Sequence, residues 1–181
     1  MLLRRLLGRW LDRWTPRKPR LPTCKDAWVA RHIYLCPLRW ADMDSLGHVN
    51  NVTYVDYLQE SRVDMLRVHA PATGGEQLAE ATVVVRHEVE FVAPLVFRFE
   101  PVRIESWVTR IRAASFTMAY EILDELPGGT RRVYTRARTV LTPYVFGEER
   151  PRRIRAEERS VLERFLEPET EPTAGPAWVR R

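Results

Sequence analysis

The pattern of hydrophobic and polar positions predicts one long helix and a set of strands. In residues 52–70, one helical face collects Tyr54, Tyr57, Leu58, Ser61, Met65 and Val68, which recur at helical spacing. Strands are predicted where apolar and polar residues alternate, over 83–91, 101–111, 114–125 and 132–146. A first strand is expected over 31–40, a hairpin turn over 126–130 and a short charged helix over 153–166. This order predicts an α+β fold in which an antiparallel sheet packs one face on the helix and leaves edges open for a second subunit.

Composition fits a globular domain with its positive charge concentrated at one end. The 181 residues are 45% hydrophobic and 29% charged, and the net charge is +5. Residues 1–25 contain eight Lys or Arg and a single Asp, so the remaining 156 residues carry 21 basic and 23 acidic groups. A role in nucleic-acid binding would therefore depend on the N-terminus alone, and no nucleic-acid partner is expected.

The chain is expected to divide into three parts. Residues 1–28 form a basic extension with a proline-rich linker, residues 29–166 the folded domain, and residues 167–181 a tail that is disordered by composition. Within residues 1–14, Leu and Trp recur at helical spacing between arginines. Two interpretations stay open: a flexible extension, or an amphipathic helix that makes weak peripheral contact with an anionic membrane.

Several functional classes find no support in the residues. Two cysteines, Cys24 and Cys36, make neither a disulfide framework nor a metal cluster, and the four histidines show no paired ligand spacing. No stretch approaches the roughly 20 apolar residues of a membrane span, and the N-terminus lacks the features of a secretory signal. A cytoplasmic protein without a metal or cofactor is the expectation.

The most informative segment is the polar loop before the long helix, WADMDSLGHVNN at residues 40–51. A calcium loop that starts at Asp42 is excluded, because Leu46 occupies a ligand position and Thr53 stands where the closing glutamate belongs. Two interpretations remain: a turn in which Gly47 supplies a positive φ and Asn50 or Asn51 caps the helix, and a catalytic loop. The residues alone favour neither.

Residues 38–66, LRWADMDSLGHVNNVTYVDYLQESRVDML, resemble the signature of the 4-hydroxybenzoyl-CoA thioesterase group of hotdog-fold acyl-CoA thioesterases. The shared features are the spacing of the two aspartates, the Gly-His-Val-Asn-Asn run, and a tyrosine-bearing helix that ends in Glu60-Ser61-Arg62. The similarity extends over about residues 30–160. The resemblance implies a hotdog fold, in which a curved antiparallel sheet of about five strands wraps one long central helix. It also implies a homodimer or a dimer of dimers, with active sites at the dimer interface.

The resemblance further implies hydrolysis of an acyl-CoA thioester to a carboxylic acid and CoA, with Asp44 as the catalytic carboxylate. Asp44 acts either as nucleophile or as general base, and the backbone N–H of Asn51 or Val52 is expected to stabilise the developing oxyanion. His48 either lines the site or fixes the loop. The candidate substrate-binding residues are Gly47, Asn50, Val52, Tyr54 and Ser115.

Other residues receive secondary interpretations. Asp42 suits a structural role, and Glu60 and Arg62 are interpreted as a helix-surface or interface ion pair. Ser115, Arg110 and Arg112 either contact the phosphates of CoA or are simply solvated. The alternative function is that of a non-catalytic hotdog protein that binds acyl groups, or a protein or membrane partner.

Overall fold

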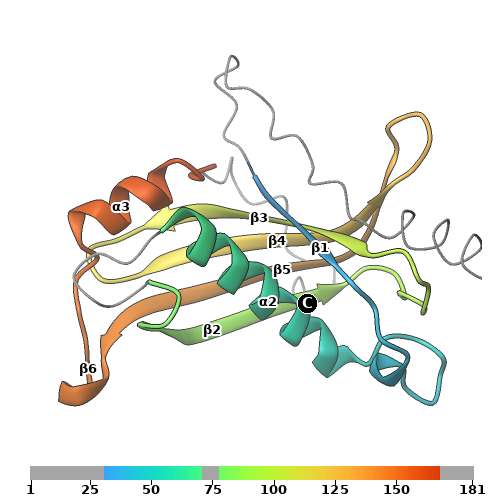
Figure 1. Cartoon of the computed structure of the whole chain (residues 1–181), viewed down its shortest axis with the longest axis horizontal. Helices are drawn as coiled ribbons and strands as arrows, with labels where there is room; N and C mark the ends of the chain where they lie inside the picture. Colours follow the sequence, from blue (N-terminus) through green and yellow to red (C-terminus); the bar gives the residue numbers. More distant parts are fainter. Residues whose placement is uncertain (1–30, 71–77, 168–181) are drawn as a thin grey trace, which may run out of the picture.

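The computed structural model describes residues 31–70 and 78–167, which form a curled antiparallel sheet around one long helix (Figure 1). The elements are β1 His32–Cys36, the short 3-10 helix η1 Trp40–Asp42, α2 Asn51–His69, β2 Thr82–Phe91, β3 Val102–Ile111, β4 Phe116–Glu125, β5 Arg131–Val145, η2 Phe146–Glu148, β6 Arg150–Pro151 and α3 Ala156–Glu163. The predicted N-terminal extension, nearly all of the predicted tail and the end of the helix at residues 71–75 lie outside the described residues. In the described part, no helix is both long and apolar enough to cross a membrane.

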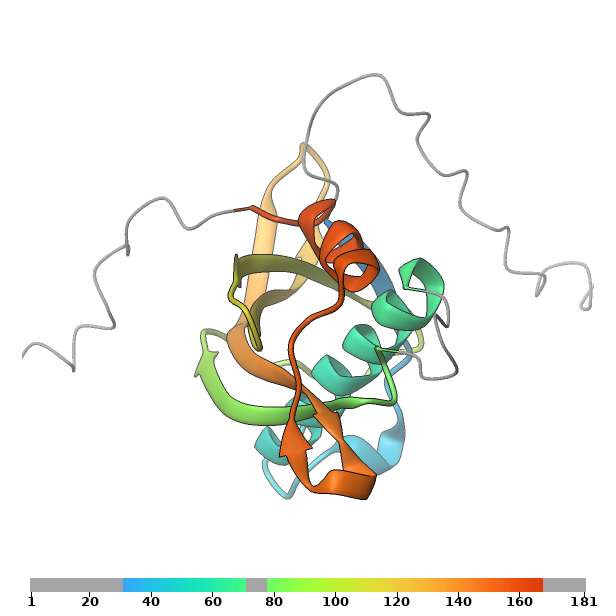
Figure 2. The same ribbon diagram turned by 90° about the vertical axis from the view of Figure 1, so that its left-hand side faces the viewer.

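The strand order is β1-β3-β4-β5-β2, and every neighbouring pair is antiparallel. Strands β1 and β2 therefore form the two edges, while the two-residue β6 pairs with the end of β5. The sheet curls so that α2 lies against its concave face (Figure 2). This arrangement confirms the predicted α+β class and the hotdog fold.

The buried face of α2 is mostly the predicted one. Leu58 and Met65 are fully buried in the core, and the hydroxyls of Ser61 and Ser106 on β3 lie 2.7 Å apart. These two small side chains let the helix approach the sheet closely. The prediction for Val68 was wrong, because this residue is 62% exposed near the end of the helix.

The four long strands were predicted to within two residues at each end. The alternation that predicted a strand over 114–125 gives β4 one fully buried face, made of Phe116, Met118, Tyr120 and Ile122. The unbroken alternation expected along β2 was wrong, because the pairing with β5 shifts between Val84 and Arg86. An extra residue at such a bulge re-aims the side chains that precede it.

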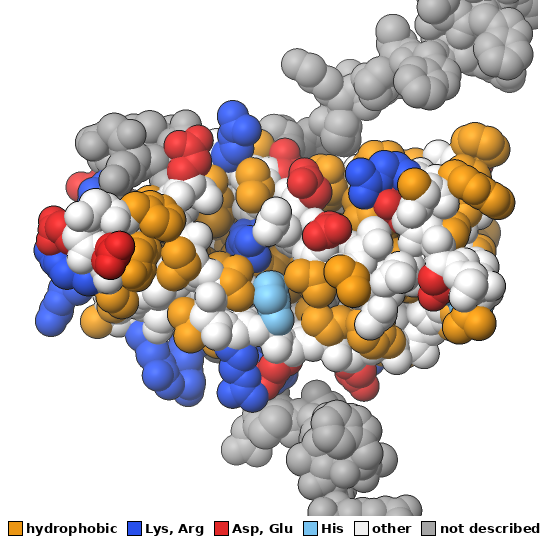
Figure 3. All heavy atoms as spheres, turned by 90° about the horizontal axis from the view of Figure 1, so that it is seen from below, with side chains coloured by type: hydrophobic (Ala, Val, Ile, Leu, Met, Phe, Trp, Pro, Cys, Tyr) orange, Lys and Arg blue, Asp and Glu red, His pale blue; other side chains and the backbone are white. Residues whose placement is uncertain are grey.

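Strand β2 is an edge strand that exposes hydrophobic side chains to solvent. Large hydrophobic side chains are exposed along it and just beyond it, at Val84, Val85, Phe91 and Val92. Hydrophobic side chains also spread over the face of the molecule shown in Figure 3, which is seen from below Figure 1. An exposed apolar edge of this length is a template for pairing with another strand.

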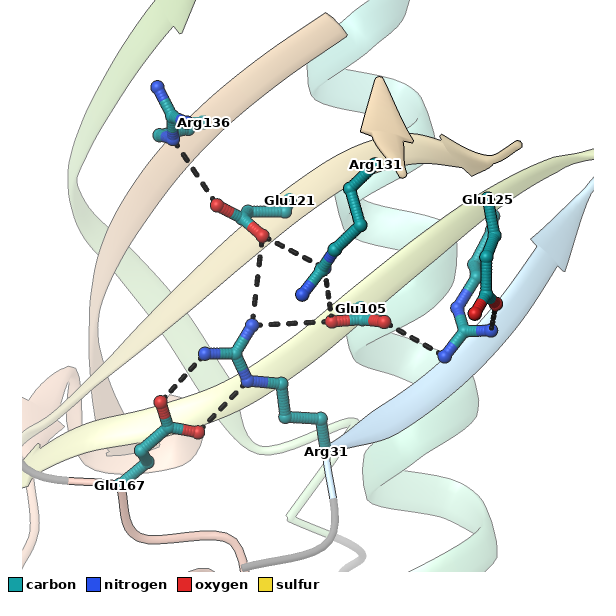
Figure 4. A network of polar contacts seen from close by, with 8 residues as sticks. Arg31, Glu105, Glu121, Glu125, Arg131, Arg136 and Glu167 are labelled. Carbon is teal, nitrogen blue, oxygen red and sulfur yellow. Dashed lines mark hydrogen bonds and ion pairs between the residues drawn. The ribbon is translucent and has the colours of Figure 1, made fainter. Parts of the chain in front are cut away.

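The outer face of the sheet carries a network of ion pairs that ties the ends of the domain together (Figure 4). Arg31, just before β1, binds both carboxylate oxygens of Glu167, at 2.9 and 2.6 Å, and lies 3.2 Å from Glu105 on β3. Arg131 bridges Glu105 and Glu121 at 2.7 and 3.0 Å. The segment after α3 also joins the sheet, where Glu167 N–H donates to the carbonyl of Val108.

His32 on β1 and His69 at the end of α2 are expected to make stability sensitive to mild acid. The ring of buried His32 packs edge-on against His69 at 5.4 Å, and burial lowers the pKa of both. The unfolded chain therefore binds protons more readily, so this contribution is complete above about pH 6.5 and is lost as pH falls below it. Carboxyls with a lowered pKa, such as Glu158, change the stability only below about pH 4.5.

We expect the urea midpoint to fall between about pH 7 and about pH 5.5, and His32→Gln to reduce this pH dependence. An unchanged midpoint in the wild type would contradict the expectation.

Candidate active site

The loop between β1 and α2 closes on itself as a small turn. Met43 and Val49 form a bridge across it, and within it the N–H of Asp44 donates to the carbonyl of His48 at 2.8 Å. Gly47 has φ +76°, a conformation that other residues adopt only with strain, and its N–H donates to the carbonyl of Asp44 at 3.1 Å. The sequence places the glycine where the turn needs it.

Asp42 is the structural carboxylate of this loop. It is 4% exposed, and its side chain accepts hydrogen bonds from the backbone N–H of Arg39 at 2.9 Å, the Arg39 side chain at 3.0 Å and the Tyr57 hydroxyl at 2.5 Å. Burial raises the pKa of Asp42, but these hydrogen bonds outweigh burial and leave it below its ordinary value. Both oxygens are engaged, so Asp42 anchors the loop to α2.

Only one of the two carboxylate oxygens of Asp44 accepts hydrogen bonds from the described residues. Its Oδ1 accepts from the N–H of Leu46 at 2.8 Å and, more weakly, from the N–H of His48 at 3.4 Å. Among the described residues no donor reaches Oδ2, and the residue as a whole is only half-buried. The turn therefore fixes the carboxylate by one oxygen and leaves the other available for chemistry.

The start of α2 supplies one open backbone donor. Asn50 is the N-cap: its Oδ1 accepts from the N–H of Val52 at 3.0 Å, and its carbonyl accepts from the N–H of Thr53 at 3.0 Å. The amide of Val52, one of two predicted oxyanion donors, is thus already occupied by the cap. The N–H of Asn51 makes no hydrogen bond within the described residues, and it lies at the positive end of the helix.

Two further predicted residues hold the site in shape. His48 contributes its backbone carbonyl and N–H to the turn around Asp44. The Tyr54 hydroxyl accepts from the N–H of Leu95 at 3.2 Å, and its ring, 3% exposed, packs edge-on against Phe91 at 5.2 Å. Tyr54 therefore joins α2 to the end of β2, whereas Asn51 and Val52 at the start of α2 are exposed.

Ser115 is not brought to this loop. Strand β1 pairs with β3 so that Cys36 lies opposite Val102, which puts the loop near the start of β3. Ser115 follows the end of β3, whose 10 residues span about 33 Å. Within one chain, the two groups of predicted site residues thus lie at opposite ends of the sheet.

Around Ser115 the structure forms a basic hollow of about 280 Å³, lined by Arg86, Arg110, Arg112, Ser115, Phe116, Thr117 and Val140. Arg86, Val140, Thr117 and Arg110 form one row across β2, β5, β4 and β3. Both end positions of the row, Arg86 and Arg110, follow a bulge in their strand. Arg86 pairs with Glu88, whereas Arg110 and Arg112 form no ion pair within the described residues. Three guanidinium groups and two hydroxyls at one hollow suit an anion such as a phosphate.

A family model described as the thioesterase-like superfamily matches residues 38–165. The chain belongs to this superfamily. No sequence among curated proteins matches the chain significantly.

Solved structures share the fold at low identity. A predicted thioesterase from Bacillus stearothermophilus is 23% identical with a TM-score of 0.65, and the match covers 77% of this chain and 99% of that one. A mutant 4-hydroxybenzoyl-CoA thioesterase, solved with 4-hydroxybenzoyl-CoA, is 17% identical with a TM-score of 0.64 over 73% and 98% of the two chains. A thioesterase from Thermus thermophilus, solved with coenzyme A and Zn, is 23% identical with a TM-score of 0.59 over 72% and 90%.

The groups that this superfamily member offers at the loop are a carboxylate oxygen and a backbone N–H. Asp44 provides the oxygen and Asn51 the N–H at the start of α2. The described residues contain no group of three or more His, Cys, Asp or Glu side chains arranged to hold a metal ion. A carboxylate and an N–H donor suit acid–base or nucleophilic chemistry.

One sequence interpretation is corrected by the helix geometry. Glu60 and Arg62 do not form an ion pair, because they point to different surroundings. Glu60 is exposed, and burial together with the negative charge of Glu60 raises the pKa of Tyr34 on β1. Arg62 is 8% exposed and lies near Tyr120 and His87. A sequence signal for this existed: Arg62 follows Leu58 by four residues, on the buried stripe. Because arginine is charged, Arg62 was expected at the surface or at an interface rather than in the core.

Proposed function

We propose that the protein hydrolyses acyl-CoA thioesters to a carboxylic acid and CoA, by the chemistry of the 4-hydroxybenzoyl-CoA thioesterase group. The observation that carries the proposal is the pairing, on one short segment, of a carboxylate with a free oxygen and a helix start with a free N–H. Asp44 supplies the first and Asn51 the second. Membership of the thioesterase-like superfamily supports the reaction class.

The chemistry follows from these two groups. As the thioester carbonyl becomes tetrahedral, negative charge grows on its oxygen, and the Asn51 N–H with the positive end of α2 stabilises that charge. Asp44 either attacks the carbonyl to give a mixed anhydride that water then cleaves, or removes a proton from the attacking water. In both routes the C–S bond breaks and CoA leaves as a thiolate. In the general-base route water supplies the second carboxylate oxygen of the product. In the anhydride route the product keeps the oxygen of Asp44 that attacked, and water, attacking the Asp44 carbonyl, replaces that oxygen in Asp44.

The separation of Ser115 from Asp44 supports a dimer. The Asp44 loop contacts the segment after β2, where Val49 N–H donates to the carbonyl of Leu95, and Ser115 lies at the end where β2 begins. Two β2 edges paired antiparallel would bring the basic hollow of one subunit toward the Asp44 loop of the other. We propose this homodimer, alone or as a dimer of dimers, as the active unit.

The basic hollow is proposed to bind the phosphates of CoA. In Arg110→Ala/Arg112→Ala we expect KM for an acyl-CoA to rise about 10-fold with kcat little changed, because the phosphates lie far from the reacting carbonyl. The measurement is steady-state kinetics at low salt. The same acyl group on pantetheine, which lacks these phosphates, should be hydrolysed equally by both proteins, and the exposed Arg67→Ala serves as charge control. An unchanged KM for the CoA ester would contradict the assignment.

The proposed function is tested by thiol release from short, long and aromatic acyl-CoAs. We expect hydrolysis of at least one class by the purified wild type. A well-folded wild type that binds an acyl-CoA but releases no thiol from any of them would favour the alternative, a hotdog protein that binds acyl groups without catalysis.

A further inference from the structure

Arg62, in the middle of α2, is a buried cation without a counter-ion. The residue is 8% exposed, and its Nη1 is enclosed with no hydrogen-bond acceptor. Within the described part of the chain no carboxylate lies within ion-pair distance of its guanidinium. Its neighbours are the Tyr120 hydroxyl and the His87 ring, both uncharged. A guanidinium enclosed in this way is costly unless an anion joins it.

Arg62 lies close to His87 of β2, and Tyr54, nearer the start of α2, packs on Phe91 of the same strand. Val55, Gln59 and Arg62 follow one another at i, i+4 and i+7 and share a stripe. The opposite side of α2 faces β1, where Asp64 lies 3.0 Å from His32. Long helical side chains lean toward the N-terminus, so the guanidinium of Arg62 leans toward the end of α2 that carries Asn51.

The side chains of β2 that lie beside α2 change from apolar to polar along the strand. Phe91 packs on Tyr54 near the start of α2, half-buried Val89 follows on the same face, and His87 comes next, beside Arg62. The His87 Nδ1 is 2.9 Å from the hydroxyl of Thr139, and within the described residues its Nε2 has no partner. The side chains between α2 and β2 form a strip of Phe91, Val89, His87 and Arg62. This strip is thus apolar near the Asp44 loop and basic toward the middle of α2.

We propose that Arg62 binds a carboxylate at the far end of the acyl group, so that the preferred substrates are CoA thioesters of dicarboxylic acids. The inference rests on the proposed function, since the acyl chain must start at the Asp44 loop. Residues 52 and 62 are about 15 Å apart along the helix axis, and the lean of the side chain shortens this to about 8–12 Å. An extended chain advances about 1.2 Å per bond, so this distance corresponds to roughly seven to ten bonds. The apolar middle of the strip suits the methylenes, and Arg62 with His87 suits the terminal carboxylate.

The decisive variant is Arg62→Met, which keeps the volume and removes the charge. The matched substrates are octanoyl-CoA and suberoyl-CoA, which differ only in the distal carboxylate. We expect the wild type to prefer suberoyl-CoA, and Arg62→Met to lose about 10- to 100-fold in kcat/KM for it while changing less than about threefold with octanoyl-CoA. Arg67→Met, an exposed charge on the same helix, should alter neither. Equal losses with both substrates would overturn the proposal in favour of a structural Arg62.

A second readout does not require catalysis. Free suberate, the reaction product, should raise the Tm of the wild type but not of Arg62→Met, and octanoate should not discriminate between them. Without ligand, Arg62→Met should be at least as stable as the wild type, because it removes a buried unpaired charge. Destabilisation with a shift from dimer to monomer would overturn the proposal and assign the counter-ion to a second copy. Suberate binding that depends on Arg62, in a protein that hydrolyses no thioester, would support the carboxylate site while contradicting the proposed function.

Discussion

Replacement of Asp44 by asparagine is expected to lower kcat for acyl-CoA hydrolysis by about 10²–10⁴-fold. The amide oxygen of asparagine can still accept the hydrogen bond from the N–H of Leu46, so the turn keeps its geometry. Only the charge and basicity of the free oxygen are removed. The measurement is the rate of thiol release under saturating acyl-CoA, with circular dichroism and the urea midpoint as checks that the fold is unchanged.

The comparison with Asp44→Ala sharpens this result. Alanine removes the catalytic oxygen and also the acceptor for the Leu46 N–H, so it should lose turnover and about 1 kcal/mol of stability as well. If Asp44→Asn retained full activity, Asp44 would not be the catalytic carboxylate. For an active wild type, a single turnover in H₂¹⁸O separates the two routes, because only the nucleophilic route places ¹⁸O in the Asp44 carboxylate.

Replacement of Asp42 by alanine is expected to lower the free energy of unfolding by about 2–4 kcal/mol. The variant leaves the buried Tyr57 hydroxyl without its acceptor at 2.5 Å and removes the acceptor of the Arg39 N–H at 2.9 Å. The ion pair itself contributes little of this, since the Arg39 side chain is 68% exposed. Urea denaturation monitored by fluorescence measures the change.

Tyr57→Phe is the matched control for Asp42. It removes one of the donors and keeps the ring in the core, so it should cost only about 1 kcal/mol. Asp42→Ala should therefore be clearly the less stable of the two. Equal stability of Asp42→Ala and the wild type would contradict the anchoring role, and a loss of turnover in Asp42→Asn with unchanged stability would move the catalytic function to Asp42.

Much of the fold could be predicted because its pattern is local. The alternation in β4 and the stripe through Leu58 and Met65 depend only on strand and helix periods, and both were buried as predicted. The failures occur where tertiary contacts override the period. A bulge after Val84 disturbs the alternation of β2, and Val68 is exposed because the buried side of α2 has shifted at its end to Leu66 and Ala70.

The candidate site was predictable as a segment but not as a geometry. The residues from Asp44 to Asn51 gather in one loop, as their spacing suggested. That the Asn50 side chain already accepts the hydrogen bond of the Val52 N–H depends on the geometry of the cap, which the sequence does not specify. The distance of Ser115 from Asp44 follows from strand register, which a single sequence does not specify. Burial of Arg62 was missed because charged residues rarely occupy a core position.

The central claim, that this member of the thioesterase-like superfamily hydrolyses acyl-CoA at Asp44, is tested most directly by one paired assay. Thiol release from short, long, aromatic and dicarboxylic acyl-CoAs is followed for the wild type and Asp44→Asn, both confirmed as folded. We predict that the wild type hydrolyses at least one class of substrate and that Asp44→Asn loses this activity by two or more orders of magnitude. Equal rates in the two proteins, or no thiol release by the wild type from any ester, would contradict the claim.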